Sequence, residues 1–426
     1  MTALKRLVNS TATYALANVI NSAIPFLLLP VLTRVLAPAE YGVVAMFTTV
    51  ITVFSAFTGL SLHGAVSVRY FNKETNHPRF VGTCLAVLSC STAFVLGIVW
   101  ILSEFFSDLV GLPRAWLLLA VVGSGFQTLI NIRLVMWQVK GVAVRYGIFQ
   151  ILQTLFNLGV SLWLVVYVEM GWEGRGVGVL VALFIFGALA VSSLFWSGLA
   201  SRSVDRKYLR ASLKFGIPLI PHSVGGMMTA ISDRFILVAL IGMGATGSYV
   251  VGAQVGMVIG LLADAFNKAF GPHLLNELQR LGGKSDLALA RQCIVVFVGL
   301  LLLSSFFVFC VPFIYKLFIG PEYYDSLIVA QLVGFGNAFL GMYYVVSGFI
   351  FYSEKTGLLA RLTLICGVFN LGMTYLFVLV FGAVGAAIGY CIIQFVFFLG
   401  ALRLCQTVSP VPWGKAFVSL LGKRSS

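Results

Sequence analysis

One apolar stretch, Ser212–Phe235, carries the residue types best suited to chemistry inside a membrane. It contains His222, which titrates near neutral pH, and the adjacent charged residues Asp233 and Arg234. A helix turns by about 100° per residue, so His222 and Asp233 share one face and Arg234 points about 100° away from it. Charges within a bilayer cost on the order of 2.5–3.5 kcal/mol each and usually face a cavity or a partner. The stretch therefore predicts a polar path for a solute.

Two further cations, Arg34 and Arg133, accompany Arg234 in the apolar part of the chain. The fixed fork of donors on an arginine matches phosphate, so these three arginines are candidates to bind a phosphate-bearing solute. Simpler interpretations stand beside this one. Arg34 can extend from a helix end to the membrane surface, and Arg133 can lie over Trp137, four residues later, as a cation–π pair.

Neutral polar side chains form stripes on several predicted helices and could line a path for a hydrophilic solute. Such stripes can equally join neighbouring helices through hydrogen bonds. The asparagines that we assign to the path are Asn18, Asn157 and Asn370.

Three titratable groups are candidates for coupling transport to an ion gradient: His222, Asp233 and Asp264. His222 could take up a proton, although packing or backbone hydrogen bonding is the simpler interpretation. Asp264 has Lys268 at the i+4 position, which favours an ordinary helix ion pair. Asp233 and Arg234 could each serve instead as an ion-pair partner for another helix.

The composition places these segments in a membrane. The 426 residues are 60% hydrophobic and 10% charged, and the mean hydropathy of +1.00 excludes an ordinary soluble domain. About twelve apolar segments have the roughly 20 residues needed to cross a bilayer, without the short alternating segments of a β-barrel. We therefore predict an all-α polytopic membrane protein. In the eighth segment, the double GxxxG of Gly252, Gly256 and Gly260 predicts close packing against another helix.

The net charge of +14 reflects membrane topology rather than a nucleic-acid partner. With the N-terminus inside, most lysines and arginines fall in cytoplasmic segments, and only a few cations, Arg175 among them, fall in outer turns. Both termini are therefore predicted in the cytoplasm. The seven cysteines form no CxxC motif and histidines do not cluster, so we expect no metal and no cofactor.

The two halves of the chain repeat each other. The sequence FNLG occurs at residues 156–159 and again at residues 369–372. Each half also opens with a pair of prolines, and proline-broken segments at matching positions of two repeats are typical of a transporter's binding site. The prolines that we assign as hinges are Pro25, Pro30, Pro218 and Pro221.

This repeat divides the chain into four predicted parts. They are an N-terminal six-helix bundle (residues 1–200), a basic cytoplasmic linker (201–215), a C-terminal six-helix bundle (216–404) and a cytoplasmic tail (405–426).

Four motifs carry a family resemblance: LTRVLAPAEYG after the first predicted helix, KFGIPLIPHS and SDRFIL in the seventh, and GSYVVGAQVG in the eighth. With the twelve-helix layout, they resemble the polysaccharide flippases of the MATE-like multidrug/oligosaccharidyl-lipid/polysaccharide exporter superfamily. Among these, the chain is most similar to the O-antigen (Wzx-type) flippases. The resemblance implies two six-helix bundles around a central cavity in the bacterial inner membrane, with alternating access between cytoplasm and periplasm.

The same resemblance implies the substrate. Such proteins move undecaprenyl-diphosphate-linked oligosaccharides, such as the O-antigen repeat units of lipopolysaccharide, and an ion gradient is the expected driving force. Membrane lipids, a polysaccharide polymerase and a chain-length regulator are the further partners that it suggests. A lipid II flippase usually has fourteen helices, two more than the count here.

Two other functions remain open on the sequence alone. A drug or metabolite antiporter of the same superfamily should prefer acidic groups for cationic drugs, whereas the apolar segments here hold slightly more arginine than aspartate. A polysaccharide polymerase or ligase would need a sizeable outer loop for its catalytic residues, and we expect no outer loop longer than about a dozen residues. We therefore predict a flippase rather than an enzyme.

Overall fold

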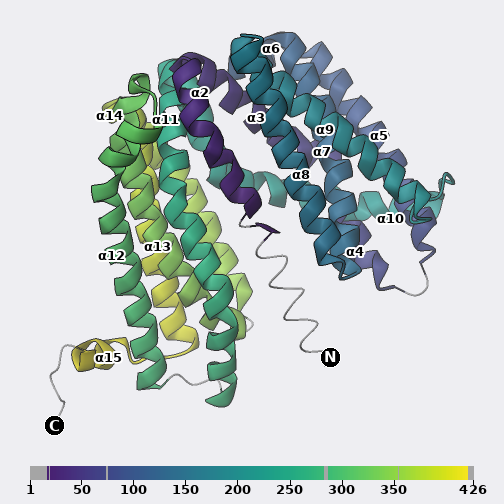
Figure 1. Ribbon diagram of the computed structural model, residues 1–426. Coiled ribbons are helices and arrows are strands. Elements are labelled where there is room, and N and C mark those ends of the chain that lie inside the picture. Colours follow the sequence, from purple (N-terminus) through teal and green to yellow (C-terminus); the bar gives the residue numbers. More distant parts are fainter. Residues whose placement is uncertain (1–16, 19, 73–74, 283–285, 354, 421–426) are drawn as a thin grey trace. The chain divides into compact units, whose positions relative to one another are not determined.

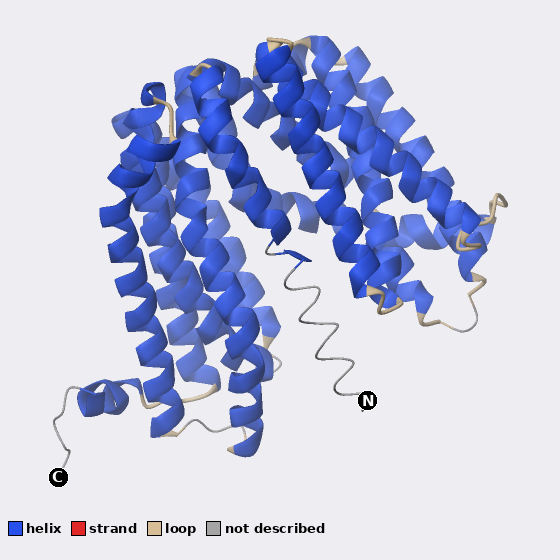
Figure 2. Ribbon diagram, in the orientation of Figure 1, coloured by secondary structure: helices blue, strands red, loops and turns tan. Residues whose placement is uncertain are grey.

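The computed structural model describes residues 17–18, 20–72, 75–282, 286–353 and 355–420. These residues are almost entirely helical (Figure 1, Figure 2). Among them, nine helices are long and apolar enough to cross a membrane, and a shorter apolar helix covers Ile20–Val35. Two of the nine contain a break, at Gly242 and at Gly382. The all-α polytopic prediction is confirmed, and about twelve crossings are consistent with these lengths.

The chain divides into two units, Met1–Gly247 and Ser248–Ser426. The first unit contains η1 (Ile24–Leu28), α2 (Leu29–Val35), α3 (Pro38–Gly59), α4 (Leu62–Tyr70), α5 (His77–Ile101), α6 (Ser103–Val110), α7 (Arg114–Val139), α8 (Ala143–Leu162), η2 (Trp163–Tyr167), α9 (Gly171–Trp196) and α10 (Arg206–Gly216). Helix α11 (Leu219–Arg280) begins in the first unit and ends in the second. The second unit continues with α12 (Leu287–Phe318), η3 (Pro321–Ser326), α13 (Leu327–Tyr352), α14 (Thr356–Val408) and α15 (Trp413–Leu420). The four-part division at residues 200, 215 and 404 remains a prediction.

Aromatic side chains pack the core of the first unit where α3, α7 and α9 meet. Phe47 stands edge-on to Trp116, with ring centroids 5.2 Å apart, and Trp116 in turn lies 4.8 Å from Trp172. A second apolar cluster includes Leu62 and Phe80 and joins α4, α5 and α7. Burying such large side chains stabilises the unit by roughly 1.5–3 kcal/mol each and holds α3 against its neighbours.

Local sequence signals set the ends of several of these helices. At the start of α3, Pro38 occupies the first turn and the Glu40 carboxylate accepts a hydrogen bond from the Ala37 N–H at 3.0 Å. At its end, Leu60 and Ser61 adopt left-handed conformations, with φ of 43° and 49°. Residues 38–70 are therefore two helices, α3 and α4, rather than one.

All four predicted hinge prolines lie at changes of helical structure. Proline lacks an N–H donor and is tolerated best in a first turn or outside a helix. Pro25 lies in η1, Pro30 lies in the first turn of α2, Pro218 lies in the turn between α10 and α11, and Pro221 lies in the first turn of α11.

The double GxxxG of the second unit packs α11 against η3 and α13. A Cβ atom added to Gly252 would lie 2.6 Å from the Ser326 carbonyl oxygen, and one added to Gly256 would lie 2.7 Å from that of Ala330. Glycine is required at both positions, because any larger side chain would push the helices apart. The close packing predicted from the GxxxG spacing is confirmed.

Candidate functional site

Arg234, half-buried on α11, is held in place by α3. Its Nη1 donates a hydrogen bond to Oγ1 of Thr49 at 2.7 Å. The Thr49 hydroxyl is buried and donates its own proton to the Ala45 carbonyl oxygen at 2.7 Å, so it offers Arg234 a lone pair. The carboxylate of neighbouring Asp233 accepts a hydrogen bond from the backbone N–H of Arg234 at 2.9 Å. The guanidinium is therefore oriented by a neutral oxygen on another helix.

A second arginine, Arg175, lies in the first turns of α9 and reaches α8. Its Nη1 donates hydrogen bonds to Oδ1 of Asn157 at 2.6 Å and to Oγ of Ser161 at 2.7 Å. Helices α8 and α9 approach closely here, because a Cβ atom at Gly178 would lie 2.2 Å from the Ser161 hydroxyl. Sequence reasoning assigned Arg175 to an outer turn and missed this role. The structure instead places it within a helix, in contact with the predicted residue Asn157.

The buried Tyr41 of α3 lies near both Arg175 and Arg234. The two cations therefore belong to one region of the first unit, which we call the arginine site. Its members are Tyr41, Thr49, Asn157, Ser161, Arg175 and Arg234.

The arginine site keeps its positive charge. The ion pairs among the described residues lie elsewhere: Arg114 with Glu104, Lys268 with Asp264, and Arg280 with Glu277. A guanidinium has five N–H donors, and the hydrogen bonds above use one terminal nitrogen of Arg175 and one of Arg234. The remaining donors can bind an anion with two parallel hydrogen bonds. The geometry suits a phosphate group.

Arg133 on α7 belongs to a second basic region. Its guanidinium carbon lies 4.1 Å from the centroid of the Trp137 ring, so the cation–π pair considered from the sequence is present. The side chain is buried, yet its Nε and Nη1 have no hydrogen-bond partner among the described residues. Partial burial and the charge of Arg133 both lower the pKa of Lys140, which begins the turn after α7. The region therefore also has donors for an anion.

The structure places the other predicted residues of the path outside the arginine site. Arg34 is exposed in the last turn of α2. Asn18 accepts a hydrogen bond from the Tyr146 hydroxyl at 3.3 Å, so it joins its own helix to α8. Asp264 pairs with Lys268 at 2.6 Å, as the i+4 spacing predicts. The side chain of His222, on α11, lies outside the part of the structure that is described.

Neutral polar groups are buried in the second unit. Asn370 accepts a hydrogen bond from the Thr374 hydroxyl at 3.4 Å. Asn337, which the sequence analysis did not single out, accepts one from the Tyr390 hydroxyl at 3.0 Å and donates one to the Gly256 carbonyl at 3.3 Å. The Asn337 side chain therefore ties α13 to both α11 and α14.

Comparison with known proteins finds sequence relatives over most of the chain and solved structures of similar fold. Lsg locus putative protein 1 of Haemophilus influenzae is 23% identical over 363 residues, which cover 82% of this chain and 85% of that protein. The structure is similar to the inward-facing conformation of a multidrug resistance MATE family transporter of the MOP superfamily, with a TM-score of 0.65 at 16% identity over 100% of both chains. It is also similar to the lipid II flippase MurJ in its inward closed conformation, with a TM-score of 0.65 at 14% identity, covering 99% of this chain and 92% of that one.

The family described as "Polysaccharide biosynthesis protein" matches residues 7–273, more than half of the chain. This match includes every member of the arginine site. The protein therefore belongs to the polysaccharide biosynthesis protein family and shares the fold of the MATE transporters and the lipid II flippase.

Proposed function

We propose that this protein is a flippase that carries an undecaprenyl-diphosphate-linked oligosaccharide, such as an O-antigen repeat unit, to the periplasmic leaflet of the bacterial inner membrane. Membership of the polysaccharide biosynthesis family supports a glycan as cargo, and the fold shared with the lipid II flippase supports translocation of a lipid-linked sugar. Transport proceeds by alternating access and is driven by an ion gradient. The distribution of positive charge supports cytoplasmic termini.

The arginine site is the observation that carries this proposal. Arg175 and Arg234 are oriented by the neutral oxygens of Asn157, Ser161 and Thr49 rather than by carboxylates of the described residues. A neutral ligand fixes a guanidinium without cancelling its charge, so the site favours a diphosphate and repels a cation. This disfavours the alternative of an antiporter for cationic drugs.

The other two predicted arginines supply further contacts for the diphosphate. Arg133 is held by Trp137 through its ring face, which leaves Nε and Nη1 for phosphate oxygens. Arg34, exposed at the end of α2, offers a further cation at a helix end. Together, Arg34 and Arg133 would let the diphosphate bind a cation at more than one depth in the membrane.

Neutral side chains would meet the sugar. An amide presents both donors and acceptors and so matches sugar hydroxyls. Asn18, Asn157 and Asn370 are the residues to which we assign this role. Asn157 has a second role, because its amide oxygen accepts the hydrogen bond that fixes Arg175.

Coupling to an ion gradient requires a group whose charge changes near the bound anion. Asp233 is the best placed, since its carboxylate bonds to the backbone of Arg234, and protonating it would strengthen the positive field at that guanidinium. His222 lies earlier on the same helix. Asp264 is the weakest of the three assignments, because Lys268 already balances its charge. We assign Pro25, Pro30, Pro218 and Pro221 as hinges of the accompanying motion.

The test is a deletion strain in which the lipid-linked repeat unit is tracked on each face of the inner membrane. We expect complete units to accumulate on the cytoplasmic face, and the wild-type gene to restore export. Single units that reach the periplasm without polymerising would indicate a polymerase or ligase instead. Unchanged glycan with altered drug sensitivity would indicate a drug antiporter. A polysaccharide polymerase and a chain-length regulator would act on the flipped product.

A further inference from the structure

Helix α10, in the segment predicted as a linker, is firmly attached to the first unit. The hydroxyl of Tyr208 accepts a hydrogen bond from the Asn76 N–H at 2.8 Å, and its ring stands edge-on to Phe80 at 5.6 Å. At the other end of α10, a Cβ atom added to Gly216 would lie 2.2 Å from the Leu60 carbonyl oxygen. One side of α10 is therefore committed to contacts within the protein.

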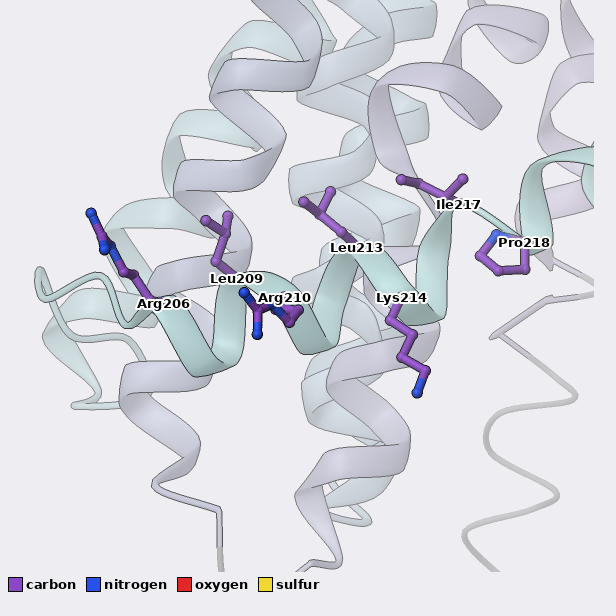
Figure 3. Close-up of a pocket in the computed structure, with 7 residues that line it drawn as sticks. All are labelled: Arg206, Leu209, Arg210, Leu213, Lys214, Ile217 and Pro218. Atoms are coloured by element: carbon purple, nitrogen blue, oxygen red, sulfur yellow. The ribbon is translucent and has the colours of Figure 1, made fainter.

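These contacts place α10 at the level where membrane-spanning helices end. Asn76 is the N-cap of α5, and Leu60 directly follows the last residue of α3. Both α3 and α5 are long and apolar enough to cross a membrane. Figure 3 shows α10 running across the neighbouring helices rather than along them. A helix in this position lies along a bilayer surface rather than through it.

Helix α10 also carries two parallel rows at i, i+4 spacing, one basic and one apolar. The basic row is Arg206, Arg210 and Lys214, all exposed. The apolar row is Leu209, Leu213 and Ile217; Leu209 is 36% and Ile217 53% exposed, while Leu213 between them packs partly against the apolar core of the first unit. The two rows line one open groove together with Pro218, and the apolar side chains point to the same side of the helix (Figure 3). Exposed apolar and cationic rows side by side are typical of helices that lie in a membrane interface.

We propose that this groove of α10 is a binding surface for anionic phospholipid headgroups, such as those of phosphatidylglycerol, in the leaflet that faces the basic linker. The exposed Leu209 and Ile217 enter the boundary of the acyl chains, and the basic row pairs with the lipid phosphates. The nearest acidic residue, Asp205, does not pair with the basic row. It is the N-cap of α10, and its carboxylate accepts a hydrogen bond from the Lys207 N–H at 2.7 Å. Each basic side chain near an anionic surface strengthens binding roughly fivefold, so three should strengthen it on the order of a hundredfold.

This surface connects lipid binding to the candidate transport helix. Only the turn that contains Pro218 separates α10 from α11, which carries Arg234. Anchoring α10 to the headgroups would hold the start of α11 at a fixed depth. The inference does not depend on the identity of the cargo.

The test is hydrogen–deuterium exchange of the full-length protein in nanodiscs. One set contains phosphatidylcholine alone, and the other contains phosphatidylcholine with phosphatidylglycerol. We expect amides 206–217 to exchange at least severalfold more slowly in the anionic discs. The variant Arg206→Gln/Arg210→Gln/Lys214→Gln should lose this protection. The control variant Arg361→Gln/Arg403→Gln/Lys415→Gln removes the same charge from exposed sites of the second unit and should keep it.

Three outcomes would overturn the proposal: equal exchange in the two discs, protection that survives in the α10 variant, or equal protection by soluble glycerol phosphate in neutral discs. The last would indicate a site for free phosphate rather than a lipid surface. A salt titration of the wild type provides a measurement that does not depend on a variant. Because exposed charges are screened within about 3 Å at 1 M salt, protection by phosphatidylglycerol should decline as salt rises, and protection that does not would also overturn the proposal.

Discussion

Nη1 of Arg175 lies 2.6 Å from Oδ1 of Asn157, across the interface between α9 and α8. This contact gives the cation a fixed position without neutralising it. The Thr49 hydroxyl holds Arg234 in the same way, through a hydrogen bond to a neutral oxygen. Two guanidinium groups held by neutral oxygens, with Tyr41 near both, are the basis of the diphosphate site proposed above.

Replacing Arg175 should therefore impair transport. Arg175→Ala removes two charge-assisted hydrogen bonds and a positive charge, and we expect export to fall by roughly ten- to a hundredfold, as losses of about 1.5–3 kcal/mol would give. Arg175→Lys keeps the charge and should retain part of the activity. Export is measured as surface glycan per unit of membrane-inserted protein. The exposed Arg114, which pairs with Glu104, supplies the control: Arg114→Ala should export normally.

The orientation of Arg234 can be tested by changing Thr49, the residue that accepts its hydrogen bond. Thr49→Val keeps the side-chain shape but removes the acceptor for Nη1, and we expect a lower affinity for the diphosphate substrate with little change in protein level. Thr52→Val on the same helix is the matched control, because the Thr52 hydroxyl bonds to the Thr48 carbonyl at 2.9 Å. Equal affinity in the two variants would remove Thr49 from the site.

In the second basic region, the pKa of Lys140 should depend on the charge of Arg133. The charge of Arg133 contributes to the lowered pKa of Lys140, so Arg133→Gln should raise the pKa of Lys140 toward its ordinary value. At a pH near the wild-type pKa, the lysine of the variant would then be more fully protonated. Titration of isotopically methylated lysines by NMR measures this pKa directly. A Lys140 pKa that does not move would show that the two cations are too far apart to share an anion.

Helix packing in the second unit makes a stability prediction. Gly256→Ala would place a Cβ atom 2.7 Å from the Ala330 carbonyl oxygen and 2.8 Å from the Gly334 nitrogen, both backbone atoms. We expect a loss of about 1–3 kcal/mol and a lower thermal midpoint in detergent. Gly299→Ala, in α12, meets nothing within 4 Å and should leave the midpoint unchanged or slightly higher. Equal midpoints for the two variants would contradict the close packing of α11 on α13.

Hydropathy and helical periodicity were sufficient to predict the all-α membrane fold, the packing at Gly256 and the pairing of Asp264 with Lys268. These features depend on neighbours in the sequence or on a helix face. The break after α3 could not be predicted, because Leu60 and Ser61 are ordinary residues whose left-handed conformation is imposed by tertiary packing. The many basic residues of α10 led us to predict a linker there, although the i, i+4 rows of a helix were present in the sequence.

The arginine site was only partly visible for the same reason. Arg234 stood out because an apolar segment surrounds it. Arg175 lies among glycines, which are typical of a turn in a sequence. Its contact with Asn157 depends on the close approach of α9 to α8, which no local pattern indicates. Thr49 was one of many hydroxyls that could bond to their own helix, and nothing local distinguished the one that also receives Arg234.

The most direct test of the central claim is transport by purified protein in proteoliposomes, using the lipid-linked repeat unit isolated from the deletion strain. The rate at which the glycan becomes accessible on the opposite leaflet would be compared for the wild type, Arg234→Ala and Thr52→Val. We predict rapid flipping by the wild type and Thr52→Val, competition by a short-chain polyprenyl diphosphate, and near-background flipping by Arg234→Ala. Wild-type flipping no faster than in protein-free vesicles, or undiminished flipping by Arg234→Ala, would contradict the account.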